Sequence, residues 1–350
     1  MAKNRESRAF RPDESTTDIR NLLQQERKIK SEFTSDIRDA ARLHGRARAN
    51  LARLSEDMLA ARPLDLDVTR EVVLAIYDSM QKNPNILLWM TNMQMPYEHH
   101  ACHSFNVAVL SMLYGRHKGK SRADMIALGT GGLLHDLGKT RISPELLDKP
   151  CRLDPDELDI VRRHAMEGYK ALDATGRLTK DVLDIVRCHH ERPDGNGYPD
   201  GMFGDSIPEL ARMVAVADAY DSIVYGYGYR QPVTPTEALR TLKVQASEEY
   251  GEEFVEDFIR CMGAYPVGSV VELNSGALVM VVASNTQARL KPKVMTLRNE
   301  DGKYEKPRML TDLSVYSDDE LAERWGIHGL VDPAVLPFDV RSVILEEIQF

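Results

Sequence analysis

The apolar residues of this chain follow a helical period over most of its length and a strand-like pattern near the carboxyl end. Between residues 90 and 246 they recur at helical spacing, and turn signals such as Lys118-Gly119 separate the runs. After Tyr265-Pro266, short runs rich in β-branched residues flank the turn Asn274-Ser275-Gly276. The pattern predicts a mainly α fold, in which a multi-helix bundle precedes a small antiparallel β appendage.

The amino-terminal segment has a helical pattern of its own. Apolar residues between Ile19 and Ile37 fall near helical spacing, and the run from Leu51 to Leu59 continues it. We expect an amphipathic helical pair packed on the body, because Glu26 and Asp36 interrupt the heptads that a dimerising coiled coil would need. Three roles are compatible with this segment: it regulates the protein, it forms a dimer interface, or it only supports the helical body.

Changes in the pattern of apolar and turn residues divide the chain into three parts. A further helix is predicted from about Asp67 to a stop before Asn83-Pro84. The capping-box pattern from Ser317 to Glu320 predicts a short helix near the carboxyl end. We therefore expect a helical segment at 1–65, a helical domain at 66–258, and a β-rich appendage with a short helix and a tail at 259–350.

Charge is distributed unevenly along the chain. The net charge is −9, but residues 1–62 hold 14 Lys and Arg against 10 Asp and Glu, so the remainder is acidic. An acidic body argues against binding to a nucleic-acid polymer. No stretch of about eighteen apolar residues suggests a membrane span, and the four cysteines lack paired spacing. These features predict a cytoplasmic protein with reduced thiols.

Histidines and aspartates recur along the body at intervals of about one helix plus a turn. Gaps of 32, 28 or 29, 25 and 28 residues would bring one set from each successive helix to a common centre. Each alone is more often a surface histidine or a paired acid, but adjacent His-Asp and His-His pairs buried without metal would be costly. Imidazoles with carboxylates suit iron, manganese, zinc or nickel, and this number implies at least two ions. The candidate ligands are His103, His135, Asp136, His164, His189, His190 and Asp218.

The residues around these ligands resemble a known family. The pair His135-Asp136, with His103 before it and Asp218 after it, is similar to the HD superfamily of metal-dependent phosphohydrolases. The stretch from His189 to Pro199 reads His-His-Glu-Arg-Pro-Asp-Gly-Asn-Gly-Tyr-Pro, and it matches the signature of the HD-GYP subfamily at every fixed position. The likeness covers roughly residues 95 to 250. HD-GYP proteins are phosphodiesterases of cyclic di-GMP, a bacterial second messenger.

The resemblance implies a catalytic centre. The chain is expected to be a hydrolase that converts cyclic di-GMP to pGpG, to GMP or to both, by a metal-activated hydroxide. The seven residues would ligate two or three divalent ions, most often Fe or Mn, with Asp136 bridging two of them. His99 stands where relatives with a third metal carry Glu, so it is a candidate extra ligand, with Glu98 or a two-ion centre as alternatives. Lys139 is expected to contact the substrate phosphate; its alternative role is a salt bridge to Asp136.

The resemblance also assigns residues around the substrate. Tyr198 is expected either to order the signature loop or to stack on a guanine, and in some relatives this loop docks diguanylate cyclases. Arg230 matches a substrate-binding position, whereas Tyr227 replaces a phosphate-binding Arg of the relatives and could stack on a base or pack in a loop. Two alternatives follow: a weakly active or inactive adaptor that binds cyclic di-GMP, or a phosphodiesterase for another cyclic dinucleotide. A homodimer is compatible with either.

Overall fold

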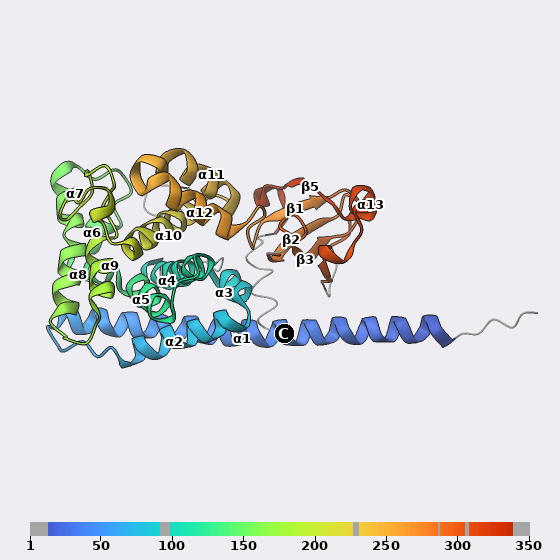
Figure 1. Ribbon diagram of the computed structural model, residues 1–350, viewed down its shortest axis with the longest axis horizontal. Coiled ribbons are helices and arrows are strands. Elements are labelled where there is room, and N and C mark those ends of the chain that lie inside the picture. The colour runs from blue at the N-terminus through green and yellow to red at the C-terminus, as the bar shows by residue number, and fades with distance from the viewer. Residues whose placement is uncertain (1–12, 92–98, 227–230, 286–287, 305–307, 339–350) are drawn as a thin grey trace, which may run out of the picture.

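The protein is a helical bundle with a small sheet at its carboxyl end (Figure 1). This computed structural model describes residues 13–91, 99–226, 231–285, 288–304 and 308–338. The predicted mainly α fold with an antiparallel β appendage is confirmed. The helices are α1 (Asp13–Leu59), α2 (Asp67–Lys82), α3 (Pro84–Thr91), α4 (His99–His117), α5 (Arg122–Leu134), α6 (Pro144–Leu147), α7 (Pro155–Arg162), α8 (His164–Asp173), α9 (Lys180–Cys188), α10 (Glu209–Tyr225), α11 (Pro235–Ala246), α12 (Glu252–Met262) and α13 (Asp318–Glu320).

Single turns of other helical types connect these elements. They are the 3₁₀ turns η1 (Leu137–Arg141), η2 (Gly204–Ser206), η4 (Leu313–Val315) and η6 (Pro333–Val335), and the π-helical turns η3 (Ser247–Gly251) and η5 (Leu321–Trp325).

The amino-terminal segment forms one continuous helix, α1, so the prediction of a helical pair was wrong. Between Asp13 and Leu59 the sequence has no proline and only one glycine, Gly45, so nothing in it stops the helix. Buried residues such as Ile37, Ala47 and Leu54 pack α1 against α2, α3 and α4. Figure 1 shows α1 along one edge of the bundle, with its amino-terminal part reaching past the helical body.

Helix α5 lies at the centre of the bundle. Its residues from Ala127 to Leu134 are all buried, as expected for a helix covered on every side. It contacts α2, α4, α9 and α10. At Gly132 an added Cβ would lie 2.9 Å from the backbone of Ala108 in α4, so this glycine lets α4 and α5 pack closely. This contact sets how near the histidine of α4 can come to the residues that follow α5.

The carboxyl-terminal sheet has the strand order β4-β3-β2-β1-β5 with antiparallel pairs throughout. Its strands are β1 (Val270–Leu273), β2 (Leu278–Ala283), β3 (Lys293–Arg298), β4 (Leu310–Asp312) and β5 (Ile327–Leu330). Gly276, at φ 81°, closes the predicted turn between β1 and β2. The predicted capping box at Ser317 is present. The two edge strands, β4 and β5, were not predicted from the sequence, and neither has a fully buried residue.

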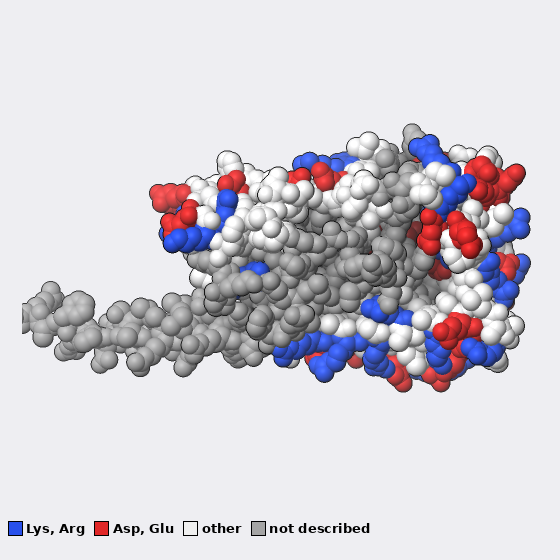
Figure 2. Space-filling model, turned by 180° about the vertical axis from the view of Figure 1, so that it is seen from behind, with Lys and Arg blue, Asp and Glu red and all other residues white. Residues whose placement is uncertain are grey.

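The sheet lies against the helical body through α3. The backbone N–H of Ser284 donates to the Asn85 side chain at 3.2 Å, and β2 contacts α3. On the face shown in Figure 2, basic and acidic side chains alternate along the lower margin. Arg46 of α1, for example, pairs with Glu71 of α2 at 2.8 Å. Among the helices of the described segments, none combines the length and apolar content needed to cross a bilayer.

Candidate metal centre

The seven predicted ligands come together from five helices. His103 lies in α4, His135 and Asp136 directly follow α5, and His164 begins α8. The pair His189-His190 follows α9, and Asp218 lies within α10. All are buried except His190, which is half-buried. Within the described residues, potential ligand atoms fall into two groups whose members lie within 4.8 Å of one another: Asp136 with His164, His189 and His190, and Asp136 with His103 and His135.

Asp136 is common to both groups, and its two carboxylate oxygens face different histidines. Oδ2 lies 3.4 Å from Nε2 of His135 and 3.7 Å from Nε2 of His103, whereas Oδ1 lies 3.4 Å from Nε2 of His164. Asp218 adds a second carboxylate, with Oδ1 at 3.0 Å from Nε2 of His103. One carboxylate placed between two sets of imidazoles can bridge two metal ions.

Four of the histidines are held by their Nδ1 atoms. Nδ1 lies 2.8 Å from the Gly132 carbonyl in His135, 2.8 Å from the Val161 carbonyl in His164, and 2.9 Å from the Val186 carbonyl in His189. A carbonyl oxygen only accepts, so each Nδ1 carries the proton. In His103 the partner of Nδ1 is the carboxylate of Asp221. In His135, His164 and His189 this arrangement fixes the tautomer that leaves Nε2 as an acceptor, as metal-ligating histidines require.

The chain leaves helical geometry at the His-Asp pair. Helix α5 ends at Leu134, and the 3₁₀ turn η1 follows, so His135, Asp136 and Lys139 do not lie on one α-helical face, as their spacing in an apolar run would predict. Residues i and i+3 eclipse in a 3₁₀ turn, so Lys139 still stands over Asp136. Its Nζ donates to Oδ2 of Asp136 at 2.6 Å, which is the salt bridge that the sequence analysis gave as the alternative role.

Burial and neighbouring charges shift the pKa values of the centre in opposite directions. Burial lowers the pKa of His164 to about 4 and that of His190 to about 3, so both stay neutral at neutral pH. Burial also disfavours charge on His103, but its hydrogen bonds to Asp218 and Asp221 outweigh that effect and raise its pKa to about 10. Burial opposes the charge of Asp136, yet His135 and Lys139 hold its pKa well below the usual range. The ionised Asp136 and the neutral His164 and His190 are thus in metal-binding form.

Several buried polar atoms of the centre have no hydrogen-bond donor from the described part of the chain, and a metal ion would satisfy them instead. Nε2 of His135 and Oδ1 of Asp136 are buried and have no hydrogen-bond partner among the described residues. The Nε2 atoms of His164 and His189, both acceptors by their Nδ1 contacts, face each other at 3.3 Å. Buried acceptors that face one another are costly without a cation between them. The donor set of imidazole nitrogens and carboxylates therefore fits divalent metal ions.

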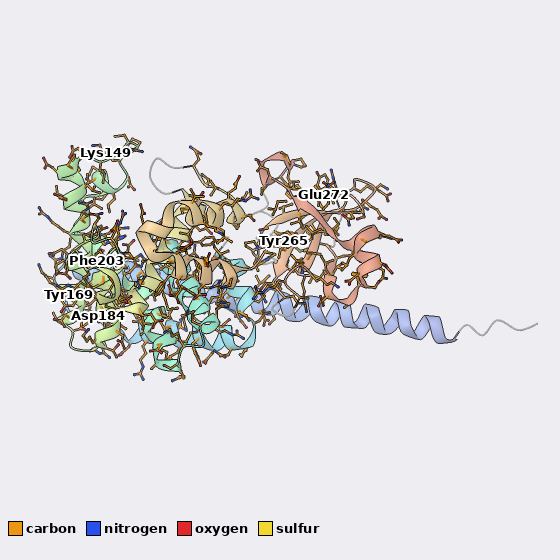
Figure 3. All side chains as sticks on the ribbon, turned by 45° about the horizontal axis from the view of Figure 1, so that its top comes forward. Lys149, Tyr169, Asp184, Phe203, Tyr265 and Glu272 are labelled. Carbon is orange, nitrogen blue, oxygen red and sulfur yellow. The ribbon has the colours of Figure 1, made fainter. Side chains whose placement is uncertain are left out.

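The signature loop after His190 is ordered by its own side chains. The buried carboxylate of Glu191 accepts from the backbone N–H of Asp200 at 2.7 Å and of Met202 at 2.9 Å. The ring of Tyr198 stacks on His190, with centroids 4.8 Å apart. Phe203, labelled in Figure 3, closes the loop through a backbone bridge, and its side chain is exposed. This stack places Tyr198 directly beside one of the candidate ligands.

Asp221, which was not predicted as a site residue, contacts the candidate ligand His103. Its Oδ2 lies 2.7 Å from Nδ1 of His103, and the Asn106 amide donates to its Oδ1 at 3.0 Å. A signal was present, because Asp221 lies three residues after Asp218 and therefore on the same face of α10. The side chain of His99, as well as Tyr227 and Arg230, lies outside the described residues.

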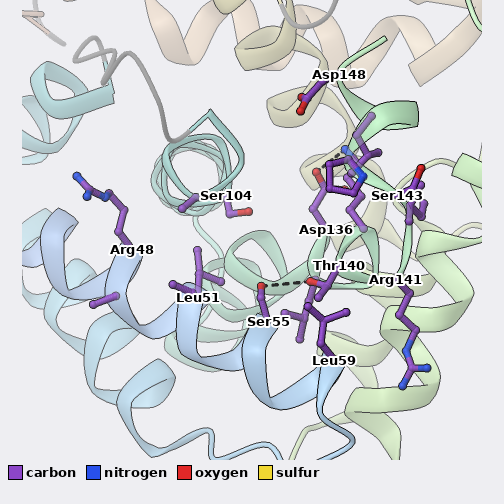
Figure 4. A pocket seen from close by; sticks show the side chains of 18 of the residues that line it. Arg48, Leu51, Ser55, Leu59, Ser104, Asp136, Thr140, Arg141, Ser143 and Asp148 are labelled. Atoms are coloured by element: carbon purple, nitrogen blue, oxygen red, sulfur yellow. Dashed lines mark hydrogen bonds and ion pairs between the residues drawn. The ribbon is translucent and has the colours of Figure 1, made fainter.

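A cavity of about 1000 Å³ opens beside the centre (Figure 4). Asp136 and Lys139 reach it from the centre, and the segment from Leu137 to Asp148 forms one side. Residues of α1 and α4 form the other sides. A cavity of this size is at the upper end of the range of small-molecule sites, about 300–1,000 Å³. The centre therefore has room beside it for a ligand much larger than a single phosphodiester group.

Comparison with known proteins agrees with this arrangement. A family model described as "HD domain" matches residues 87–254. A Pseudomonas aeruginosa protein named a cyclic di-GMP phosphodiesterase is 31% identical over 301 residues, which cover 84% of this chain and 72% of that protein. A Vibrio cholerae protein named a 3'3'-cGAMP-specific phosphodiesterase is 36% identical over 143 residues, 41% of this chain and 31% of the relative. The solved structure of an HDG"Y"P protein from Bdellovibrio bacteriovorus superposes with a TM-score of 0.55 at 18% identity, covering 70% and 79% of the two chains, and so shares the fold.

Proposed function

This chain belongs to the HD-GYP family of HD-domain proteins, and on that premise we propose that it is a metal-dependent phosphodiesterase that hydrolyses cyclic di-GMP to pGpG, GMP or both. The observation that carries the proposal is the position of Asp136. Its carboxylate lies between two groups of histidines and also reaches a cavity large enough for a dinucleotide. The name of the Pseudomonas relative supplies the substrate class.

We infer that two divalent ions, Fe or Mn, are held by the two groups of side chains. Bound ions would supply a hydroxide near neutral pH and would neutralise the charge of the phosphodiester. Asp136 would bridge them, and the remaining ligands would be His103, His135, His164, His189, His190 and Asp218. A further ion at His99 stays a prediction, because that side chain is outside the described residues.

The role proposed for Lys139 is to hold a phosphodiester oxygen. Burial opposes its charge, but the carboxylates of Asp136 and Asp218 outweigh that effect and raise its pKa, so the ammonium stays charged. Its side chain lines the cavity next to Asp136. An ammonium at this place can donate to an oxygen that becomes more negative during attack on phosphorus. If Oδ2 of Asp136 held a metal ion, Lys139 would no longer pair with that oxygen, and its ammonium would be available to the substrate.

A second candidate substrate is another cyclic dinucleotide. The Vibrio relative is named for 3'3'-cGAMP, and it is similar to this chain over 143 residues. Cyclic di-GMP and 3'3'-cGAMP differ in one purine base, so they present the same phosphodiester to the centre. Discrimination between them would therefore come from cavity residues, and comparison of kcat/KM for the two compounds distinguishes the candidates.

The remaining expectations stay predictions. These are the docking of diguanylate cyclases on the signature loop, a homodimer, a cytoplasmic location, and substrate contacts by Tyr198, Tyr227 and Arg230. The exposed ring of Phe203 beside the signature loop is compatible with a docking surface.

The proposal is tested by product and metal analysis of one preparation. Protein purified without oxygen and supplied with ferrous or manganous ion should convert cyclic di-GMP to pGpG or GMP, as followed by chromatography. Asp136→Ala should abolish turnover and lower the metal content. Asp257→Ala is the matched control, because Asp257 is also buried but belongs to neither group of candidate ligands and does not line the cavity. Absence of wild-type turnover, or full turnover by Asp136→Ala, would contradict the proposal.

A further inference from the structure

One side of the cavity beside the metal centre is formed by α1, the amino-terminal helix. Gly45, Ala49, Ala52, Ser55 and Leu59 follow one another at intervals of three or four residues and all line the cavity. This spacing puts them on one face of the helix. Leu54 and Met58, on the neighbouring face, are buried in the bundle. We call the five cavity residues the α1 stripe.

The α1 stripe is tied to the segment that carries the catalytic groups. The hydroxyl of Thr140 donates to the hydroxyl of Ser55 at 3.1 Å, and Thr140 directly follows Lys139. Figure 4 shows this bond between α1 and the turn that also bears Asp136. The helix η1 packs on α1 in the same place. The stripe therefore has a fixed position relative to the reacting groups.

The size and lining of the cavity indicate what lies against the stripe. A phosphodiester at Asp136 and Lys139 would occupy one corner of about 1000 Å³, so the rest is available to the remainder of the substrate. The stripe residues Gly45, Ala49 and Ala52 are small and exposed, and a Cβ added at Gly45 would meet nothing within 4 Å. Small, uncharged positions leave room for the flat face of a base.

A cation stands at the other end of the cavity. Arg48, on α1, also lines it, and in Figure 4 Leu51 and Ser104 lie between Arg48 and Asp136. A cyclic dinucleotide has two phosphodiesters on opposite sides of its ring. When one is at Asp136, the other points away from the metal centre, where a guanidinium can bind it.

We propose that α1 is the specificity wall of the active site: its stripe of Gly45, Ala49 and Ala52 receives the nucleoside remote from the reacting bond, and Arg48 binds the second phosphodiester. This inference rests on the proposed function and goes beyond it, because it makes the amino-terminal helix part of the substrate site. Ala49 and Ala52 are then positions whose size determines which diesters are accepted, while the chemistry stays with the metal centre.

The test is to enlarge residues of the α1 stripe and to compare the activity of each variant toward two substrates. In Ala52→Leu, and separately in Ala49→Leu, the ratio of kcat/KM for cyclic di-GMP to kcat/KM for methyl p-nitrophenyl phosphate should fall about tenfold, which corresponds to about 1.4 kcal/mol, because the larger side chain overfills the contact. The small diester has no second nucleoside to meet the wall. Ala60→Leu is the matched control: Ala60 is exposed next to the end of α1 and does not line the cavity. Its ratio should equal that of the wild type.

Binding of cyclic di-GMP, measured by calorimetry, is a second readout that does not need turnover. Its Kd should rise at least about tenfold in Ala52→Leu and stay constant in Ala60→Leu. An unchanged ratio and an unchanged Kd in both wall variants would overturn the inference while leaving the proposed function intact. If the wild-type protein binds cyclic di-GMP without hydrolysing it, the proposed function is wrong. The Kd values of the wall variants then decide whether α1 contacts the ligand. Absence of both binding and turnover would overturn both.

Discussion

The Oδ2 atom of Asp221 lies 2.7 Å from Nδ1 of His103, on the side of the ring opposite to Nε2, which is 3.0 Å from Asp218. Two carboxylates of α10, three residues apart, thus contact the two nitrogens of one histidine of α4. The Asn106 amide, one turn further along α4, donates to the other oxygen of Asp221. Asp221 is therefore a positioning residue that keeps the proton on Nδ1 and directs Nε2 to the metal centre.

Replacing Asp221 by Asn should weaken metal binding with little change in fold. The amide keeps the shape of the side chain but removes the charge that makes His103 a better ligand, so we expect about 10–100-fold lower metal affinity. Competition with a chelator measures this change. Asp257→Asn is the control, because Asp257 is also buried but pairs with Lys118 and Arg260 and belongs to neither group of candidate ligands. Equal metal affinity in wild type and Asp221→Asn would refute the positioning role.

Replacing Lys139 by Met should lower kcat and preserve the metals. Loss of one donor to the developing charge costs about 10²–10³ in kcat in other enzymes. Metal content should not fall, because the ammonium competes with metal for Oδ2 of Asp136. Steady-state kinetics and metal analysis of the same sample separate the two effects. Lys149→Met serves as control, since Lys149 pairs with Glu157. A normal kcat in Lys139→Met would mean that the role of Lys139 is limited to its salt bridge with Asp136.

Gly138→Ala should disrupt the centre through the backbone. A Cβ at this position would lie 1.9 Å from the carbonyl oxygen of His164 and 2.6 Å from the backbone N of Gly168, and neither can move without shifting α8. We expect lower thermal stability and loss of metal, since His164 would leave Asp136. Gly45→Ala is the matched change in open space, and it should raise stability slightly because alanine favours the helix. Calorimetry and metal content report both results; a normal metal content in Gly138→Ala would contradict this packing.

The stability of the metal-free protein should fall with acidification because of His44. Burial in α1, with help from Arg48, lowers the pKa of His44 from 6.5 to about 4. Between these values the unfolded chain binds a proton that the folded protein excludes, so stability rises with pH across this window and is level above it. The difference amounts to about 3 kcal/mol for a shift of this size.

His44→Leu isolates that contribution. The ring packs edge-on against Phe105, with centroids 4.8 Å apart, and leucine can fill the same apolar site. His164, His189 and His190 titrate in the same direction in both proteins, so they cancel in the comparison. Denaturant unfolding in chelator at pH 7.5 and pH 4.5 should show a smaller acid loss in the variant. Parallel losses would mean that His44 contributes nothing to the pH dependence.

Much of the centre could be predicted from local patterns. His135 and Asp136 stand out because two ionisable residues interrupt an apolar run, and the spacing to His164 and His189 matches a helix plus a turn. The end of α5 at Leu134 was not predictable in the same way. The apolar pattern runs on through Leu137, and the 3₁₀ turn arises from the close approach of Gly138 to α8, a contact between segments distant in sequence.

The helical class, the order of the candidate ligands and the strand pattern of the carboxyl-terminal sheet could be predicted, because they depend on periodicity, turn chemistry and residue type within short windows. How those groups meet depends on contacts between segments that are distant in the chain. Asp221 contacts a histidine 118 residues away, Asp136 divides its oxygens between two groups, and α1 closes the cavity beside them. Such relations depend on how helices pack across the bundle, and helical period alone carries no information about which neighbour a face will meet.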